Sequence, residues 1–232
     1  MPIVLIIGAG ARIGLATART FSAAGYKVVV ASRSNNCGSQ FTFIPFDAAR
    51  PESVAGLFKK VHSDVGIPNV VIYNAYSVSF APPDAPFDPS IENFQHGLNV
   101  NTTSPYFAAY ESVKGFEKLG PSGLGPQGGT FMFTGNIGHI TALPGLLAFI
   151  TQKSASASMI QGLALASLHG KPYKFYHVDQ RRENGQNVTF DLDGPAHGDT
   201  FLDLAQDPKQ KAWDYTFARG KGYMKFPRIE VF

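Results

Sequence analysis

The sequence has 232 residues, with 20 Lys or Arg against 17 Asp or Glu, and a formal net charge of +3. Hydrophobic residues make up 44% and charged residues 16%, which excludes the disordered class because such a chain can bury enough apolar surface to fold. The small net charge argues against a nucleic-acid partner, and a lone cysteine, Cys37, excludes an internal disulfide and a cysteine-based metal site. Because no apolar run reaches the length of about 18 residues that a membrane span needs, and no signal peptide precedes the first apolar run, we expect no membrane partner and a cytoplasmic protein.

Strand-like and helix-like segments alternate along most of the chain. Short apolar runs rich in β-branched residues predict buried strands at 3–7, 27–31, 41–46, 70–73, 130–134 and 175–178. Helical periodicity predicts helices at 13–24, from Pro51 onward, at 90–118 with a perturbation at Pro105, and at 151–168, with loops at 77–89 and 120–129. This order predicts an α/β fold: one doubly wound domain over 1–232, with a mainly parallel sheet and helices on both faces.

A glycine-rich turn lies between the first predicted strand and the first predicted helix. Glycines allow the backbone to turn tightly and to approach a diphosphate, which the positive end of the following helix stabilises. Because the turn lies between a strand and a helix, nucleotide binding is a better interpretation of it than a plain connecting turn. The residues expected to bind the phosphates are Gly8, Gly10, Ala11, Arg12, Ile13 and Gly14.

The residue types at the end of the second predicted strand indicate whether the chain binds NAD or NADP. An acidic residue there would bind the ribose hydroxyls of NAD, whereas arginine accommodates the 2′-phosphate of NADP. The sequence has Ala31, Ser32 and Arg33 at this point, without an acid. We therefore expect Ser32 and Arg33 to bind NADP(H).

Over residues 3–179 these motifs resemble the short-chain dehydrogenase/reductase family. The turn resembles the family's TGxxxGxG with Arg12 in place of the middle glycine. Three further matches follow in the family's order: Asp47-Ala48 resembles the adenine-contacting site, Asn74-Ala75 the NNAG motif, and Val100-Asn101 the motif that supplies a catalytic Asn. The resemblance implies an oxidoreductase of the Rossmann fold.

The sequence departs from the family pattern at the catalytic residues. The family uses a Ser and a Tyr-x-x-x-Lys, whose i and i+4 spacing lets the Lys lower the pKa of the Tyr and bind the nicotinamide ribose. Here Lys153 is present, but Phe149 replaces the Tyr and Asn136 stands at the Ser position. Asp179-Gln180 stands where the family has Pro-Gly. The resemblance thus indicates a divergent member that lacks the catalytic Tyr and Ser.

Three functions are compatible with this pattern. The first is an NADP(H)-dependent oxidoreductase with an atypical active site that reduces an imine or iminium carbon in specialised metabolism. Hydride transfer to a substrate that is already cationic, such as an iminium ion, needs no proton donor; alternatively His139 or Tyr76 donates the proton. The second is a non-redox cyclase or isomerase that retains the cofactor and uses aromatic residues, namely Tyr73, Tyr76, Phe80 and Phe149. The third is a non-catalytic NADP(H)-binding regulator.

The remaining expectations concern partners and the C-terminal part. We expect a small, largely apolar substrate, and a substrate lid at about 180–227 in which residues 194–198 form a mobile loop. By resemblance we expect a homodimer or homotetramer that assembles through the helices at 90–118 and 151–168. We expect no metal site, because the other histidines show no close pairs: His62, His96, His169, His177 and His197.

Overall fold

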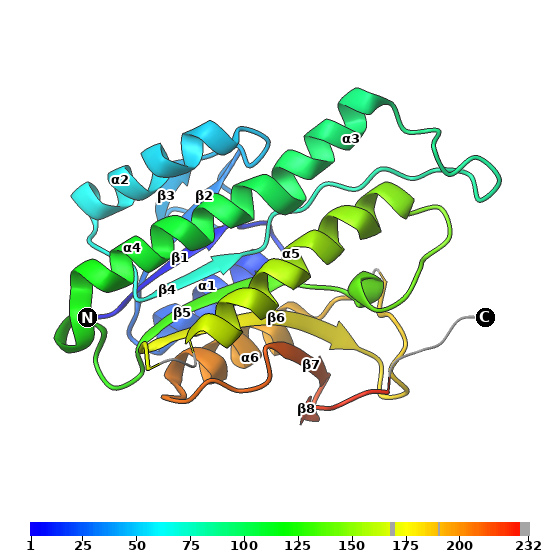
Figure 1. The fold of residues 1–232 in the computed structure, drawn as a ribbon. Coiled ribbons are helices and arrows are strands. Elements are labelled where there is room, and N and C mark those ends of the chain that lie inside the picture. Colours follow the sequence, from blue (N-terminus) through cyan, green and yellow to red (C-terminus); the bar gives the residue numbers. More distant parts are fainter. Residues whose placement is uncertain (168–169, 190, 228–232) are drawn as a thin grey trace.

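Seven parallel strands and one short antiparallel strand form the central sheet of the computed structural model, which describes residues 1–167, 170–189 and 191–227 (Figure 1). The strand order is β3-β2-β1-β4-β5-β6-β7-β8, and β8 is antiparallel to β7. The strands are β1 (Ile3–Ile7), β2 (Lys27–Ser32), β3 (Thr42–Pro45), β4 (Val70–Tyr73), β5 (Gly129–Thr134), β6 (Tyr173–Arg181), β7 (Asp214–Ala218) and β8 (Gly222–Tyr223). This arrangement confirms the predicted single α/β domain of the Rossmann-like type.

Helices cover both faces of the sheet, as Figure 1 shows. They are α1 (Ile13–Ala23), α2 (Val54–Asp64), α3 (Ile91–Leu98), α4 (Ser104–Leu124), α5 (Leu147–Ser167) and α6 (Gly194–Gln206). Side chains of β1 alternate between the two faces, because successive strand residues point in opposite directions. Val4 and Ile6 pack in the core beneath α1 and α6, whereas Leu5 and Ile7 pack in the core beneath α2, α4 and α5.

The predicted helix at 90–118 is interrupted near its middle. Ser90 caps α3 by accepting a hydrogen bond from Asn93 N, and a π-helical turn of Asn99–Thr103 then leads into α4. Pro105 lies in the first turn of α4, where its missing N–H costs little. The prediction of a long helix over 90–118 with a perturbation near Pro105 is therefore confirmed in outline, because α3, the π-helical turn and α4 follow one another without a break. The prediction of a loop at 120–124 was wrong, because α4 continues to Leu124 across a kink at Gly120.

Most of the described residues after 172 belong to strands of the sheet or to helix α6. Strand β6 runs to Arg181, three residues past Val178, which is the last β6 residue to pair with β5. The strand continues because β7 still pairs with it. Residues 194–198 form the start of α6, so the prediction of a mobile loop there was wrong. Gly194 and Gly198 allow α6 to approach α1: an added Cβ would lie 2.8 Å from the carbonyl oxygen of Arg12 and 2.7 Å from Thr20 Oγ1, respectively. The substrate lid expected at about 180–227 stays a prediction. Within that range, residues 182–193 connect β6 to α6.

Within the described residues, no helix combines the length and the apolarity that crossing a membrane requires.

Candidate active site

The glycine-rich turn follows β1 and is held by the segment that follows β4. Gly8 has a φ of +82°, and a Cβ there would lie 2.2 Å from the backbone N of Ala75, so only glycine fits. Asn74 fixes the same turn by donating from Nδ2 to the carbonyl oxygen of Gly8 at 2.9 Å. A Cβ at Gly10 would meet nothing within 4 Å. The backbone at Gly10 is therefore open on the side where a ligand would approach.

The N-terminus of α1 has the properties of an anion site. Arg12 precedes the helix and does not cap it with its side chain, and the first turn contains no acidic residue. Ala11 and Arg12 are exposed, whereas Ile13 and Gly14 are buried. The first backbone N–H groups of a helix and its dipole favour a negative charge, so this end of α1 fits the diphosphate of a dinucleotide.

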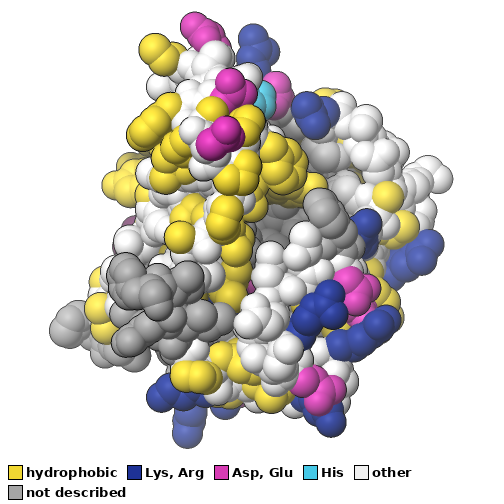
Figure 2. Space-filling view, turned by 90° about the vertical axis from the view of Figure 1, so that its right-hand side faces the viewer, with side chains coloured by type: hydrophobic (Ala, Val, Ile, Leu, Met, Phe, Trp, Pro, Cys, Tyr) yellow, Lys and Arg dark blue, Asp and Glu magenta, His cyan; other side chains and the backbone are white. Residues whose placement is uncertain are grey.

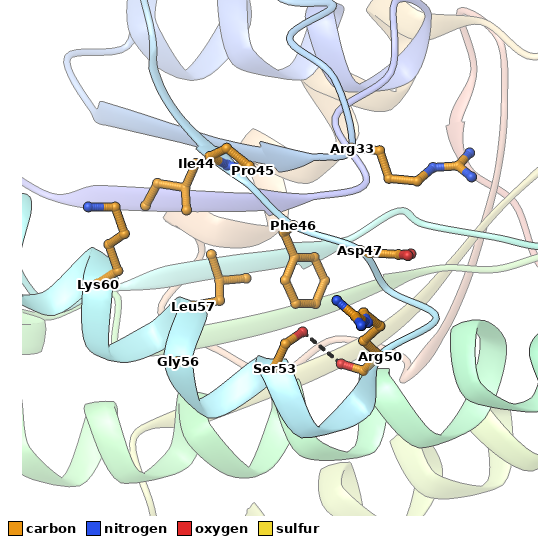
Figure 3. Close-up of a pocket in the computed structure, with 10 residues that line it drawn as sticks. All are labelled: Arg33, Ile44, Pro45, Phe46, Asp47, Arg50, Ser53, Gly56, Leu57 and Lys60. Carbon is orange, nitrogen blue, oxygen red and sulfur yellow. Dashed lines mark hydrogen bonds between the residues drawn. The ribbon is translucent and has the colours of Figure 1, made fainter.

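A cavity of about 470 Å³ lies beside the ends of β2 and β3 (Figure 3). Three cations and one carboxylate line it, so its charge favours an anion: Arg33, Arg50, Lys60 and Asp47. In Figure 3 the side chains of Arg33 and Asp47 extend on the same side, while Lys60 lies at the opposite end. Asp47 is oriented by a hydrogen bond of 3.0 Å that Oδ1 accepts from Ala49 N, and Ser32 Oγ donates to the carbonyl oxygen of Ser34. The buried Ala48 follows Asp47, and its carbonyl oxygen accepts a hydrogen bond from Ser104 Oγ.

Helix α5 presents Phe149 and Lys153 one turn apart. Lys153 is buried, donates from Nζ to the carbonyl oxygen of Thr134 at 2.7 Å, and lies 4.0 Å from the ring centroid of Phe133. Burial lowers the pKa of Lys153 to about 7, although the negative charge of Asp179 opposes this shift. Phe149 is partly buried and carries no titratable group.

Asn101 lies in the π-helical turn and is completely buried. Its Oδ1 accepts from Ser77 N at 3.1 Å, and its Nδ2 donates to the carbonyl oxygen of Ser77 at 2.7 Å and to Gln152 Oε1 at 2.9 Å. Gln152 in turn donates to the carbonyl oxygen of Phe94 at 3.0 Å. The side chain of Asn101 therefore joins three segments. Sequence reasoning missed Gln152 and Ser77, since nothing in their types or spacing indicates this contact.

Asn136 and His139 flank a short turn after β5. Asn136 Oδ1 accepts a hydrogen bond of 2.9 Å from Gly138 N, so the side chain stabilises its own loop. His139 donates from Nδ1 to the carbonyl oxygen of Asn136 at 2.8 Å, and its Nε2 lies 2.9 Å from Asp214 Oδ2. Burial opposes protonation of His139, but Asp214 raises its pKa overall. Both ring nitrogens of His139 face protein oxygens, so the side chain is not positioned to donate a proton to a substrate.

The expected aromatic pocket is only partly assembled. Tyr73 is fully buried, and its hydroxyl donates to the carbonyl oxygen of Val100 at 2.6 Å, so its assignment to a pocket wall was wrong. Tyr76 and Phe80 are 68% and 64% exposed. Figure 2 shows hydrophobic side chains gathered on the face that carries the 77–89 loop and α3. Exposed apolar side chains in and around these segments are Tyr76, Phe80, Phe87, Ile91, Phe94 and Leu147.

Comparison of the sequence with known proteins shows which family the chain belongs to. The family model described as short chain dehydrogenase matches residues 2–169. A protein of Cryptosporiopsis sp. (strain 8999), "Short chain dehydrogenase/reductase dmxR12", is 36% identical over 239 residues, which cover 97% of this chain and 95% of that protein. The chain therefore belongs to the short-chain dehydrogenase/reductase family, a family of oxidoreductases.

Solved structures support the same fold. A metagenomic short-chain oxidoreductase in complex with NADP superposes with a TM-score of 0.77 at 14% identity, covering 94% of this chain and 95% of that chain. A 4-hydroxyisoleucine dehydrogenase complexed with NADH superposes with a TM-score of 0.68 at 18% identity, covering 78% and 76%. Because one neighbour holds NADP and the other NADH, these structures do not discriminate between the two cofactors.

Proposed function

We propose that this chain is an NADP(H)-dependent oxidoreductase with an atypical active site, and that it reduces an iminium carbon, including that of an imine that binds in its protonated form. The observation that carries the proposal is the pair on α5: Lys153 is retained, while Phe149, one turn earlier, has no proton to donate. Reduction of a ketone creates an alkoxide that needs a proton, whereas an iminium ion becomes a neutral amine on accepting a hydride.

The proposed cofactor preference rests on charge. Bound NADPH would supply the hydride. The turn at Gly8–Gly14 and the start of α1 would hold its diphosphate, Asp47 and Ala48 would face the adenine, and Arg33 would pair with the 2′-phosphate. Cationic residues outnumber the single carboxylate that lines the neighbouring cavity, and this balance favours NADP(H) over NAD(H).

Lys153 would bind the nicotinamide ribose. A protonated amine has three donors, and the carbonyl oxygen of Thr134 accepts one of them. Because burial lowers its pKa to about 7, Lys153 carries only part of its full positive charge near neutral pH. This reduced charge weakens the repulsion that a lysine would otherwise exert on a cationic substrate.

The surface near the site favours a largely apolar substrate. Tyr76 precedes the 77–89 loop, Phe80 and Phe87 lie within it, and Leu147 begins α5; all four are exposed. These side chains could cover apolar parts of a substrate and would lose contact with water on binding. A small, apolar amine precursor fits this surface better than a highly charged metabolite.

We also propose that the chain forms a homodimer or homotetramer through α4 and α5. The outer face of α4 carries three exposed aromatic residues, Tyr106, Phe107 and Tyr110, and α5 carries the exposed Leu165. Aromatic residues on one face of a helix are typical of a subunit interface.

The direct test compares an iminium ion with the ketone of the same carbon skeleton, with NADPH oxidation followed spectroscopically. We expect turnover of the iminium ion and much slower or no turnover of the ketone. An isomeric product formed without NADPH oxidation would identify the cyclase or isomerase instead, and tight NADPH binding without turnover of any imine would identify the regulator.

A further inference from the structure

Three side chains that are distant in sequence meet beyond the carboxyl end of β5. His139 comes from the turn after β5, His177 from β6, and Asp214 is the first residue of β7. One potential ligand atom from each residue lies within 4.8 Å of the others. His139 Nε2 is 2.9 Å from Asp214 Oδ2, and His177 Nδ1 is 3.1 Å from Asp214 Oδ1.

We propose that His139, His177 and Asp214 bind a divalent transition-metal ion, with Zn²⁺ as the best chemical match. Two imidazole nitrogens and one carboxylate oxygen are a donor set that zinc uses with a water molecule in the fourth position. Magnesium favours oxygen donors and an octahedral shell, so the two histidines discriminate against it.

A hydrogen bond to the backbone orients the ring of His139, as is usual for histidines that bind a metal. Its Nδ1 donates to the carbonyl oxygen of Asn136 at 2.8 Å, which leaves Nε2 as the ligand atom in the neutral tautomer. Metal-binding histidines almost always donate their second ring N–H in this manner, since the contact fixes both the tautomer and the ring orientation. The hydrogen bond to Asn136 thus directs Nε2 toward Asp214.

The sheet positions the other two ligands. His177 and Asp214 are register partners on the parallel strands β6 and β7. Gly135 makes room for the imidazole of His177, because a Cβ at position 135 would lie 2.2 Å from its Cε1. The indole of Trp213 lies 6.2 Å from the ring of His139 and 6.4 Å from that of His177, measured between ring centroids. This arrangement gives a rigid, partly apolar surrounding for an ion.

An ion can reach the three ligands from the side of Asp214. The side chains of His139 and His177 are 5% and 0% exposed, whereas that of Asp214 is 27% exposed. The carboxylate would therefore face solvent and leave a coordination position for water. Bound metal would connect the loop that carries Asn136 to the β6–β7 edge of the sheet.

The test uses protein without an affinity tag, freed of metal by a chelator and exchanged into chelator-free buffer. Titration with Co²⁺ is followed by visible absorption, and Zn²⁺ and Mg²⁺ are titrated by calorimetry. We expect one Co²⁺ or Zn²⁺ per chain, a Co²⁺ spectrum of low-coordinate geometry, and negligible Mg²⁺ binding. His139→Gln and Asp214→Asn should each weaken Zn²⁺ binding by about a hundredfold or more. His96→Gln, which changes an exposed histidine on α3, should bind like the wild type.

Circular dichroism and NADPH binding would verify that each variant is folded, and they separate this result from the proposed reductase activity. Absence of Co²⁺ and Zn²⁺ binding by the wild type would overturn the proposal. Unchanged Zn²⁺ affinity in a folded Asp214→Asn variant would overturn it as well, and the three residues would then form a hydrogen-bonded network only.

Discussion

Lys153 donates a hydrogen bond of 2.7 Å from Nζ to the carbonyl oxygen of Thr134, the last residue of β5. The contact holds the amine against the sheet and places it 4.0 Å from the ring centroid of Phe133. Burial in this position lowers the pKa of Lys153 to about 7, well below its ordinary value of 10.5. Protonation of Lys153 therefore affects the stability of the fold.

Lys153 should make stability rise with pH between about 7 and 10.5. In this range the unfolded chain binds the proton of Lys153 more strongly than the folded chain, so raising the pH favours folding. Below pH 7 both states hold the proton and the destabilisation is at its largest. The contribution should approach about 1.4 kcal/mol per pH unit in the middle of the range. Asp179 and His177 are titratable groups that interact with Lys153 within the described part of the chain.

The measurement is the free energy of unfolding from denaturant titrations between pH 6 and 10. The difference between wild type and Lys153→Met isolates the lysine, because Met has a similar length and no charge. Lys153→Met should be the more stable protein at pH 6, with the two converging at higher pH. A difference that does not vary with pH would show that Lys153 keeps an ordinary pKa.

Phe149→Tyr should create or raise ketone reduction. The new hydroxyl would stand one turn from Lys153 and supply the proton that an alkoxide needs, and positioned acids contribute about a hundredfold or more to rate. We expect kcat/KM for a ketone to rise at least about tenfold, with iminium reduction little changed. Phe149→Leu is the matched control, and it should raise kcat/KM for neither the ketone nor the iminium ion. If Phe149→Tyr leaves ketone reduction at the wild-type level, loss of the Tyr alone does not explain the substrate preference.

Arg33→Ala should weaken NADPH binding selectively. Removing a charge-assisted contact to the 2′-phosphate should raise the Kd for NADPH about tenfold or more while leaving the Kd for NADH nearly unchanged. Lys60→Ala is the control, since Lys60 lies at the opposite end of the cavity and pairs with Asp64 at 2.8 Å (Figure 3). Equal weakening of both nucleotides by Arg33→Ala would contradict the proposed role. Fluorescence titrations of both reduced cofactors provide the data.

Two glycines of the same turn should respond differently to alanine. Gly8→Ala combines a positive φ with a 2.2 Å approach to Ala75 N, so it should destabilise the fold by about 2 kcal/mol or more. Gly10→Ala meets no atom of the protein within 4 Å, so it should keep the fold and lower NADPH affinity, because the methyl group would occupy the space of the diphosphate. Thermal unfolding and NADPH titration of both variants give the comparison. Gly10→Ala with wild-type NADPH affinity would place the diphosphate elsewhere.

Charge on the outer face of α4 should prevent assembly. The double variant Tyr106→Glu and Tyr110→Glu places two carboxylates on the exposed aromatic face, and light scattering after gel filtration should change from an oligomer to a monomer. Tyr223→Glu on β8 is the control and should leave the oligomer intact. A monomeric wild type at micromolar concentration would refute the proposed assembly.

Local sequence patterns predicted the first part of the fold well. The bounds of β1 and β4 agree with the sequence prediction, because short buried strands with β-branched residues are bounded by clear turn signals. The π-helical turn at Asn101 could not be predicted, since it depends on the contacts of Asn101 with Ser77 and Gln152. The extension of β6 to Arg181 likewise depends on pairing with β7, a strand that the sequence pattern did not indicate.

The residues of the candidate site that belong to short motifs could be predicted from the sequence, whereas clusters formed by distant residues could not. The glycine turn, Arg33 and the Phe149–Lys153 pair follow from motifs with fixed spacing. The cluster around Asp214 has no local signal, because His177 and His139 are 37 and 75 residues away from it. His169, which was among the scattered histidines, lies outside the described residues. Tertiary structure alone brings such a cluster together.

The central claim is that the chain transfers a hydride from NADPH to a carbon that needs no proton from position 149. The most direct measurement is the ratio of kcat/KM for a stable iminium ion to that for the ketone of the same skeleton, with wild-type protein and NADPH. We expect a ratio of at least about a hundred, because a positioned general acid contributes about a hundredfold or more to the rate and ketone reduction here lacks one. A ratio near one, or faster ketone reduction, would contradict it.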